Sequence, residues 1–543
     1  MTGEPWILAV DLGNGGPKVA VVSLRGEVRR TAMRPVQVHI GLDGAATQDA
    51  VEWWELLQEA AREAIEGADA DRARLHAVAI TGQWASTIPV DKHGEPVGPV
   101  LLWADTRARD LSARVVGGPV NVNGYAPQKV LPFIRITSGA PSLNGADPTG
   151  HALLLRERMP EIYAQTATLL EPVDYLGLRF TGRAAATPAS MAASWLTDNR
   201  PGAAHGYVDA LVTRTKRDRA RLPELLPTGS VLGPLLPQVA ESLGVSASLG
   251  GDGVPVVCGT PDVHAAVVGS GAVAPYETHM AISTTSWVSS RVPFKRTDLL
   301  HSIAVIPGLD PNHPLVANNQ ETGGAALQWL REQIIAPHDG LIGGGSGIGA
   351  SGAAEEKLDP TFEEMLALAA TAPAGAEGLL FMPWLNGERS PVDDKVARGG
   401  WLNLSLRTDR AMLIRSVLEG VAYNARWLFE SYEKFLKRDV PRVRLLGGGA
   451  QSALWCQIYA DVLGRPVEQV PDARHAQLRG AALWARISLG ELRLEDVPDL
   501  VPAAETFVPS AHTRLTYGDA YAEYTKLHGT LKGLYARLNG DRS

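Results

Sequence analysis

Short apolar runs separated by turn-forming residues open the chain. Three runs rich in strand-forming residues predict three consecutive strands at residues 6–10, 18–24 and 28–35. Residues 51–64 then place apolar side chains at the three-to-four-residue spacing of a helix, and residues 75–81 form another apolar run. The pattern therefore predicts several strands followed by alternating helices and strands.

A similar order of elements recurs in the second half. Residues 277–284 and 286–292 are predicted strands around a turn of Thr and Ser. Helices are predicted after them at residues 323–333, 361–371, 410–436 and 517–538, with another that begins near Ser452. Because each half opens with a strand–turn–strand unit, we predict two related domains, residues 1–271 and 272–543. The glycine-rich residues 337–354 are interpreted as a mobile surface insertion.

Composition narrows the class of protein. A chain of 543 residues is too long for one ordinary core, and 45% hydrophobic with 20% charged residues is typical of a soluble globular protein. The net charge of −8 argues against a nucleic-acid-binding surface. The two cysteines, Cys258 and Cys456, cannot form a disulfide framework and are interpreted as buried, reduced thiols.

The chain also lacks the sequence signals of export or membrane insertion. Its start has neither a basic region nor a long apolar region, and no run of about 18 apolar residues occurs. We therefore expect a cytoplasmic monomer or homodimer with no membrane or nucleic-acid partner.

The first motif that suggests chemistry is the turn after the first strand. Here Asp11 is followed by Gly13, Asn14 and, at the start of the next strand, Lys18. Glycines in such a turn let backbone N–H groups approach phosphate oxygens, and an aspartate at a strand end can hold a hydrated divalent cation. An ordinary hairpin turn is the alternative, since Asn-Gly is a strong turn signal.

Two further motifs in the second half suggest phosphate and nucleotide contacts. Thr284, Thr285 and Ser286 lie between two strands and could form a second phosphate clamp, or only a turn. Residues 447–451, which include Gly448, Gly449 and Gln451, follow a strand and precede a helix. Such a junction presents free N–H groups to a nucleotide, although close strand–helix packing also needs glycine.

Asp262 follows the predicted buried strand at residues 254–259. A carboxylate there could accept the proton of an attacking hydroxyl, whereas a helix N-cap is the structural alternative. The sequence G-x-G-x-x-G at residues 347–352 is not interpreted as a dinucleotide site, because no strand precedes it and no clear helix follows it.

Taken together, these segments resemble the FGGY family of carbohydrate kinases, which belongs to the superfamily of actin, hexokinase and heat-shock ATPases. Further segments resemble the family in the same order along the chain: residues 81–83, 102–107, 127–131, 174–176, 180–182, 190–192, 323–325 with Trp329, 383–391 and 418–420. Residues 447–467 resemble the xylulose kinase branch in particular. The resemblance implies an α/β fold of two actin-like, ribonuclease H-like ATPase domains flanking a catalytic cleft.

The resemblance also implies roles for residues. It places Asp262 as the general base, Asp11 and Asp262 as groups that organise Mg²⁺, and ATP as the phosphoryl donor. The ATP contacts would come from the three motifs and from the helix near Trp329: Gly13, Asn14, Lys18, Thr284, Thr285, Ser286, Gly324, Gly448, Gly449 and Gln451. The sugar contacts would be Gln83, Trp84, Asp105, Asp262 and Val263.

Several positions depart from the family pattern. Xylulose kinases typically have Met-His where this chain has Trp84-Ala85, and Asn where it has Val263. The usual Thr of the first phosphate loop is Asn14. The late pattern Glu-x-x-Ala-Leu-Gly-Ala-Ala is altered across residues 474–482. Because the first two changes remove polar partners for sugar hydroxyls, the sequence predicts a small sugar or polyol as acceptor without naming it.

We therefore expect ATP-dependent phosphorylation of a primary hydroxyl. Two alternatives remain open from the sequence. One is a catalytically silent relative that senses a sugar or nucleotide, and the other is an actin-like ATPase or chaperone module without a sugar substrate.

Overall fold

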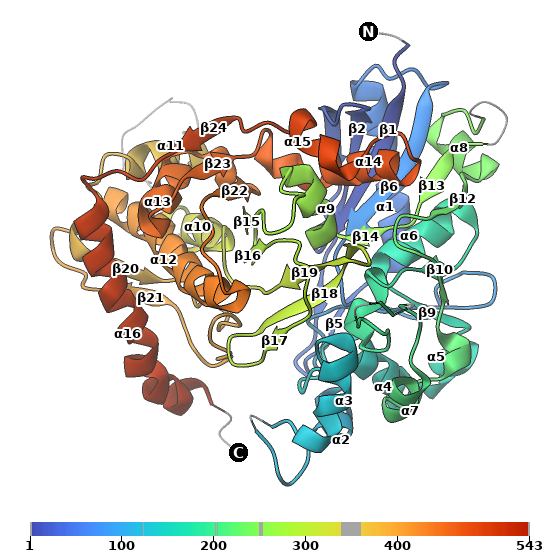
Figure 1. The fold of residues 1–543 in the computed structure, drawn as a ribbon, viewed down its shortest axis with the longest axis horizontal. Coiled ribbons are helices and arrows are strands. Elements are labelled where there is room, and N and C mark those ends of the chain that lie inside the picture. Colours follow the sequence, from blue (N-terminus) through green and yellow to red (C-terminus); the bar gives the residue numbers. More distant parts are fainter. Residues whose placement is uncertain are drawn as a thin grey trace, which may run out of the picture.

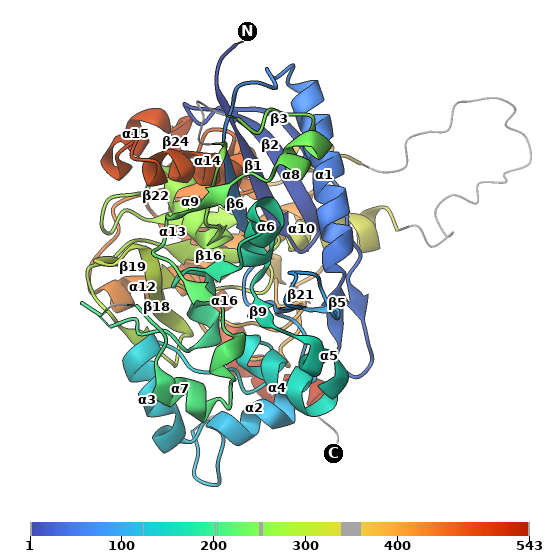
Figure 2. The same ribbon diagram turned by 90° about the vertical axis from the view of Figure 1, so that its right-hand side faces the viewer.

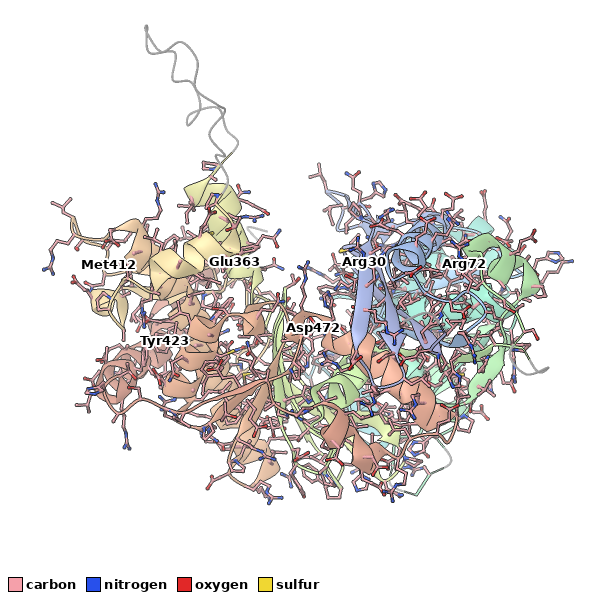
Figure 3. The ribbon with its side chains drawn as sticks, turned by 90° about the horizontal axis from the view of Figure 1, so that it is seen from above. Arg30, Arg72, Glu363, Met412, Tyr423 and Asp472 are labelled. Carbon is pink, nitrogen blue, oxygen red and sulfur yellow. The ribbon has the colours of Figure 1, made fainter. Side chains whose placement is uncertain are left out.

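A computed structural model describes residues 3–122, 124–200, 202–203, 205–248, 253–337 and 360–540. Two α/β lobes lie side by side (Figures 1 and 2). In the view from above, Arg30 lies on one lobe, Glu363 on the other and Asp472 between them (Figure 3). The glycine-rich insertion predicted at residues 337–354, like the G-x-G-x-x-G sequence within it, lies outside the described residues apart from Pro337.

The first lobe is built on a mixed sheet with the strand order β12-β13-β6-β1-β2-β3. Its strands are β1 (Trp6–Gly13), β2 (Gly16–Ser23), β3 (Val28–Met33), β6 (Leu75–Gly82), β12 (Val231–Pro234) and β13 (Pro255–Val257), and β14 (Thr260–Pro261) also pairs with β6. β1, β2 and β3 are antiparallel, whereas β6 runs parallel to β1, β13 and β14. The predicted strands at the start of the chain are therefore confirmed.

The two faces of this sheet carry side chains of different size. On β1, the large Trp6, Leu8 and Val10 belong to the core shared with α1 (Ala50–Gly67). The opposite face carries small residues such as Ala9, which pack against the second lobe. Because side chains alternate along a strand, one buried strand can pack against α1 on one face and against the second lobe on the other. Small side chains on the second face let a helix approach closely.

Most of the remaining helices and strands of the first lobe form its lower part, whereas α8 (Pro237–Leu243) lies near its upper end (Figure 1). The others are β4 (His39–Ile40), β5 (Ala46–Gln48), β7 (Ile88–Val90), β8 (Val100–Leu101), α2 (Arg109–Val116), α3 (Pro127–Thr137), α4 (Pro148–Arg158), α5 (Pro160–Gln165), β9 (Thr168–Leu170), α6 (Pro172–Thr181), β10 (Ala185–Ala186), α7 (Asp209–Arg214) and β11 (Glu224–Leu225).

The second lobe repeats the start of this topology. Its sheet has the order β16-β15-β22-β23-β24, from β15 (His279–Ile282), β16 (Ser286–Ser289), β22 (Val443–Leu446), β23 (Val467–Gln469) and β24 (Glu505–Phe507). β15 and β16 form an antiparallel hairpin, and β22 pairs in parallel with β15 and β23. The repeat is incomplete, because β17 (Thr297–Asp298), β18 (Ile303–Asp310) and β19 (His313–Ala317) form a separate sheet.

Helices complete the second lobe. They are α10 (Ala325–Leu330), α11 (Phe362–Ala369), α12 (Arg410–Leu436), α13 (Ala453–Leu463), α15 (Val497–Leu500) and α16 (Arg514–Asn539), with the strand pair β20 (Leu380–Met382) and β21 (Gly400–Leu402). The bounds of α12 agree with the predicted helix at residues 410–436. The helix predicted at residues 323–333 is shorter than expected, because it changes at Arg331 into a π-helical turn, Arg331–Ile335.

The lobes are joined mainly by two helices that cross, α9 (Asp262–Ser270) and α14 (Ala476–Ser488) (Figures 1 and 2). A Cβ atom added to Gly269 would lie 1.7 Å from the carbonyl oxygen of Ala476, and one added to Gly480 would lie 1.9 Å from that of Ala265. The two backbones are therefore in direct contact. α14 also lies on the small-residue face of the first sheet, against β1 and β6.

A second contact joins the lobes near the C-terminal end of α3. The Lys295 ammonium group donates to the carbonyl oxygens of Ile134 and Arg135, and the Thr297 hydroxyl donates to that of Ser138 at 2.5 Å. These three hydrogen bonds are partly or fully exposed to solvent. The lobes therefore meet at a tightly packed helix crossing and, at some distance from it along the sequence, at this polar contact, while Arg479 and Arg486 of α14 also donate to the carbonyl oxygens of Gly26 and Leu24.

The prediction for the cysteines is confirmed, since Cys258 and Cys456 are both buried and free. Over the described ranges, no helix combines the length and apolar character that a membrane span needs.

The helix crossing can be tested with two glycine substitutions of opposite expected effect. Gly480→Ala should lower the free energy of unfolding by about 1–3 kcal/mol, because the added methyl group overlaps a backbone carbonyl. The control Gly529→Ala adds the same methyl group within α16, where nothing lies within 4 Å of it. It should raise the free energy by up to about 1 kcal/mol through helix propensity alone. Urea unfolding of the full chain measures both, and an equal effect of the two substitutions would contradict the packing.

Candidate active site

The ends of three neighbouring strands bring polar groups together at one edge of the first sheet. In register, Asp11 of β1 lies opposite Thr81 of β6, which lies opposite Thr260 of β14. The Thr81 hydroxyl fixes this arrangement by donating to the carbonyl oxygen of Thr260 at 2.9 Å. Asp262 begins α9 directly after β14. The sheet therefore places both predicted carboxylates at the carboxyl ends of parallel strands, where α/β folds commonly bind ligands.

Asp262 is the first residue of α9 and not its N-cap, which is Pro261. Its Oδ1 atom accepts a hydrogen bond of 2.7 Å from the backbone N–H of Val263. Loss of hydration and, to a smaller extent, the negative charge of Asp11 together raise the pKa of Asp262 to about 7. Asp262 is thus partly exposed and has a pKa near neutral pH, and among the described residues its hydrogen bond holds only Oδ1.

Asp11 shares this environment. Loss of hydration raises its pKa, while the positive charges of Lys18 and then His475 lower it. The Lys18 ammonium nitrogen lies 4.0 Å from Oδ2 of Asp11. The negative charges of Asp11 and Asp262 repel each other where hydration is poor. Their carboxylate oxygens fit a hydrated divalent cation such as Mg²⁺.

The turn after β1 leaves room for a ligand. A Cβ atom built on Gly13 meets nothing within 4 Å, whereas one on Gly16 would lie 2.0 Å from the carbonyl oxygen of Arg34. The side chain of Asn14 accepts a hydrogen bond of 2.9 Å from the indole of Trp103. Close packing at Gly16 and the hydrogen bond of the Asn14 side chain therefore hold the turn in place, whereas the space beside Gly13 is open.

Three glycine and hydroxyl motifs of the second half converge on one turn. The backbone N–H groups of Gly323 and Gly324 donate to Thr284 and Ser283 at 2.9 and 2.6 Å. A Cβ atom on Gly447 would lie 2.8 Å from the Ser283 hydroxyl oxygen. Thr284 is exposed at the tip of this turn, while Ser286 is buried and donates to Ala281. The sequence motifs around Thr284, Gly324 and Gly448 are thus parts of one surface.

The surface continues into the glycine turn after β22. Gly448 is exposed and a Cβ atom built there meets nothing within 4 Å. A 3₁₀ turn, Gly449–Gln451, leads into α13, and Ser452 caps that helix by accepting from the N–H of Trp455. The predicted helix start near Ser452 is confirmed. An open glycine next to a helix N-terminus fits the flat face and the negative charge of a nucleotide.

The predicted sugar side lies on the loop after β6. Gln83 is buried, its backbone N–H donates to Leu12 at 2.7 Å, and its Nε2 atom has no partner within the described chain. The partly exposed Trp84 donates from its indole to the carbonyl oxygen of Ser190 at 2.8 Å. Val263 is also partly exposed. The loop therefore carries one amide donor without a partner among the described residues and one partly exposed aromatic ring.

Unlike the other predicted sugar contacts, Asp105 is held by an ion pair. It is fully buried, and the Arg107 guanidinium contacts its Oδ2 atom at 2.6 Å and its Oδ1 atom at 3.1 Å. The N–H of Ala46 also donates to Oδ2 at 3.1 Å. Contact of Asp105 with a sugar stays a prediction. In this structure its carboxylate binds the Arg107 guanidinium and the backbone N–H of Ala46.

Sequence reasoning missed His475, whose positive charge acts on Asp11 from the second lobe. The sequence does mark this residue, because His475 occupies the position of the glutamate in the family pattern Glu-x-x-Ala-Leu-Gly-Ala-Ala. Only the fold shows that this departure lies next to the first phosphate motif.

Comparison with known proteins agrees with this geometry. The sequence profiles of the FGGY family of carbohydrate kinases match residues 6–269 for its N-terminal domain and residues 264–489 for its C-terminal domain. The chain is 25% identical to a xylulose kinase of Staphylococcus epidermidis, with 98% of each chain covered. It is 26% identical to the xylulose kinase of Escherichia coli K12, covering 98% of this chain and 99% of that one.

The fold is also shared with solved structures. A gluconate kinase from Lactobacillus acidophilus superimposes with a TM-score of 0.81 at 20% sequence identity, covering 98% of this chain and 100% of that one. The predicted fold class, two actin-like α/β domains, is therefore confirmed.

The coupling of the two carboxylates can be tested without any reaction. Asp11→Asn removes the negative charge that raises the pKa of Asp262, so the midpoint of Asp262 should fall below its value of about 7. Infrared difference spectra of protein with ¹³C-labelled aspartate, taken across a pH series, measure this midpoint. The band should vanish in Asp262→Asn, which assigns it. An unchanged midpoint in Asp11→Asn would show that the two groups do not interact.

Proposed function

The chain belongs to the FGGY family of carbohydrate kinases, and on that premise we propose that it transfers the γ-phosphoryl group of ATP to a primary hydroxyl of a small sugar or polyol, with Asp262 as general base. The observation that carries this proposal is the partly exposed Asp262 carboxyl group at the start of α9, with a pKa of about 7 beside Asp11. A base with a pKa near the working pH accepts a proton most effectively.

Asp262 would act on the acceptor hydroxyl. Its carboxylate takes the hydroxyl proton as the oxygen forms a bond to the γ-phosphorus, and the bond from that phosphorus to the β–γ bridging oxygen breaks. The products are a sugar phosphate and ADP, and the proton stays on Asp262 until solvent removes it. Burial of the site strengthens these interactions, since charge is poorly screened where water is excluded.

The phosphate chain of ATP would be bound from both lobes. Gly13 and Asn14 offer backbone N–H groups and Lys18 a positive charge from the first lobe, while the turn of Thr284, Thr285 and Ser286 faces it from the second. Gly324, Gly448, Gly449 and Gln451 would contact the adenosine. Asp11 and Asp262 would hold Mg²⁺, which when bound neutralises charge on the phosphate oxygens.

The acceptor would bind on the loop that carries Gln83 and Trp84. The unpartnered Nε2 atom of Gln83 can donate to a sugar oxygen, and the ring of Trp84 can cover the apolar face of a carbon chain. The relatives named above include kinases of xylulose and of gluconate, so the family admits both a ketose and an aldonate. Ala85 and Val263 stand where the xylulose kinase pattern has His and Asn, which supports a substrate other than D-xylulose.

The proposal is tested by a coupled assay of ADP release across a panel of ketopentoses, aldonates and polyols. The wild-type chain should consume ATP only with an acceptor, and ³¹P–¹H coupling in the product should identify a CH₂–O–P group. Asp262→Asn should lower turnover by about 10²–10⁴-fold, the usual contribution of a general base. ATP binding, measured by calorimetry, should remain.

The control is Asp519→Asn, which removes an exposed carboxylate of α16 and should leave turnover unchanged. Near-wild-type turnover of Asp262→Asn would overturn the assignment of the base. ATP hydrolysis that does not depend on any acceptor would overturn the proposed reaction.

A further inference from the structure

A short turn of the second lobe holds a histidine in a fixed orientation. Asp472 adopts a left-handed backbone conformation with φ of 43°, and the 3₁₀ turn Ala473–His475 follows it. Nδ1 of His475 lies 2.9 and 3.1 Å from the two carboxylate oxygens of Asp472. Among the described residues, nothing contacts its Nε2 atom through a hydrogen bond. A ring that donates from Nδ1 to a carboxylate can, in its doubly protonated form, also donate from Nε2–H to an anion.

This turn is attached to the surface proposed to bind the nucleotide. The backbone N–H of Gly447 donates to the carbonyl oxygen of Ala473 at 2.8 Å, and the turn packs against the 3₁₀ turn Gly449–Gln451. Asp472 lies between the two lobes (Figure 3). His475 therefore reaches the space between the lobes from the nucleotide side.

The partner across that space is the first phosphate motif. The positive charge of His475 favours the ionised form of Asp11, as Lys18 does from its own lobe. Lys18 lies on β2 and His475 directly before α14, so two cations on different lobes act on one carboxylate. The side chain of His475 is 19% exposed and so keeps access to the space between the lobes.

We propose that His475, oriented by Asp472, binds the phosphate chain of ATP from the second lobe and is the counterpart of Lys18 on the first. The inference rests on the proposed function for its ligand, ATP. It assigns a cationic donor to a position where the family pattern Glu-x-x-Ala-Leu-Gly-Ala-Ala has a negative charge. Asp472 is a positioning residue, because it acts only through the ring that it holds.

The test compares two ligands that differ only in the phosphate chain. Calorimetry gives the dissociation constants of Mg·ATP and of adenosine for the full chain. His475→Gln should weaken Mg·ATP about tenfold or more, the usual value of a charged hydrogen bond. Adenosine binding should not change. His475→Arg keeps a cation and should recover most of the affinity for Mg·ATP, and Asp472→Asn should give a smaller loss than His475→Gln.

A matched control exists in the second lobe. His301 pairs with Asp298, three residues before it, through Nδ1 at 2.7 Å, but it lies beside the separate sheet of β17 and β18. His301→Gln should leave both dissociation constants unchanged.

Two results would overturn the inference. One is unchanged binding of Mg·ATP by His475→Gln, and the other is an equal loss for ATP and adenosine, which would indicate a structural role only. The assay of the preceding section separates the two proposals. A chain that phosphorylates no acceptor but shows the ATP-specific loss retains this inference and loses the proposed reaction.

Discussion

The crossing of α9 and α14 determines where every other part of the site can lie. At Gly269 and Gly480 the two backbones touch, so neither position can carry a side chain without separating the helices. Asp262 begins one helix, and His475 directly precedes the other. Each helix follows a strand end of its own lobe. The contact therefore fixes two helices and the polar groups at their N-terminal ends. The charge of His475 acts on Asp11, and the charge of Asp11 acts on Asp262.

The electrostatics of the site follow from this arrangement. Asp11 and Asp262 lie at the ends of β1 and β14, on either side of β6, where burial and the charge of Asp11 raise the pKa of Asp262. Lys18 and His475 oppose that effect at Asp11. The pKa of both aspartates is raised by loss of hydration, but only Asp11 has cations, Lys18 and His475, among the causes that lower it. The difference comes from the sign of the neighbouring charges.

The sequence predicted the parts of the fold that depend on local patterns. The hairpin of β1 and β2, the strand β6 and the bounds of α12 follow from apolar periodicity, and the helix that begins near Ser452 was also predicted. What it missed depends on contacts between distant segments. The π-helical turn after α10 and the pairing of Asp105 with Arg107 leave no periodic signal, and the place of His475 depends on one left-handed residue, Asp472.

The two contacts between the lobes differ in kind, and this sets how firmly each is held. The crossing of α9 and α14 is backbone against backbone, and its separation would expose apolar surface. The contact through Lys295 and Thr297 consists of three hydrogen bonds that water can replace. The side of Lys295 is therefore held less firmly than the helix crossing. Because Asp11 and Asp262 both lie at strand ends of the first sheet, a change at the Lys295 side leaves their relative position unaltered.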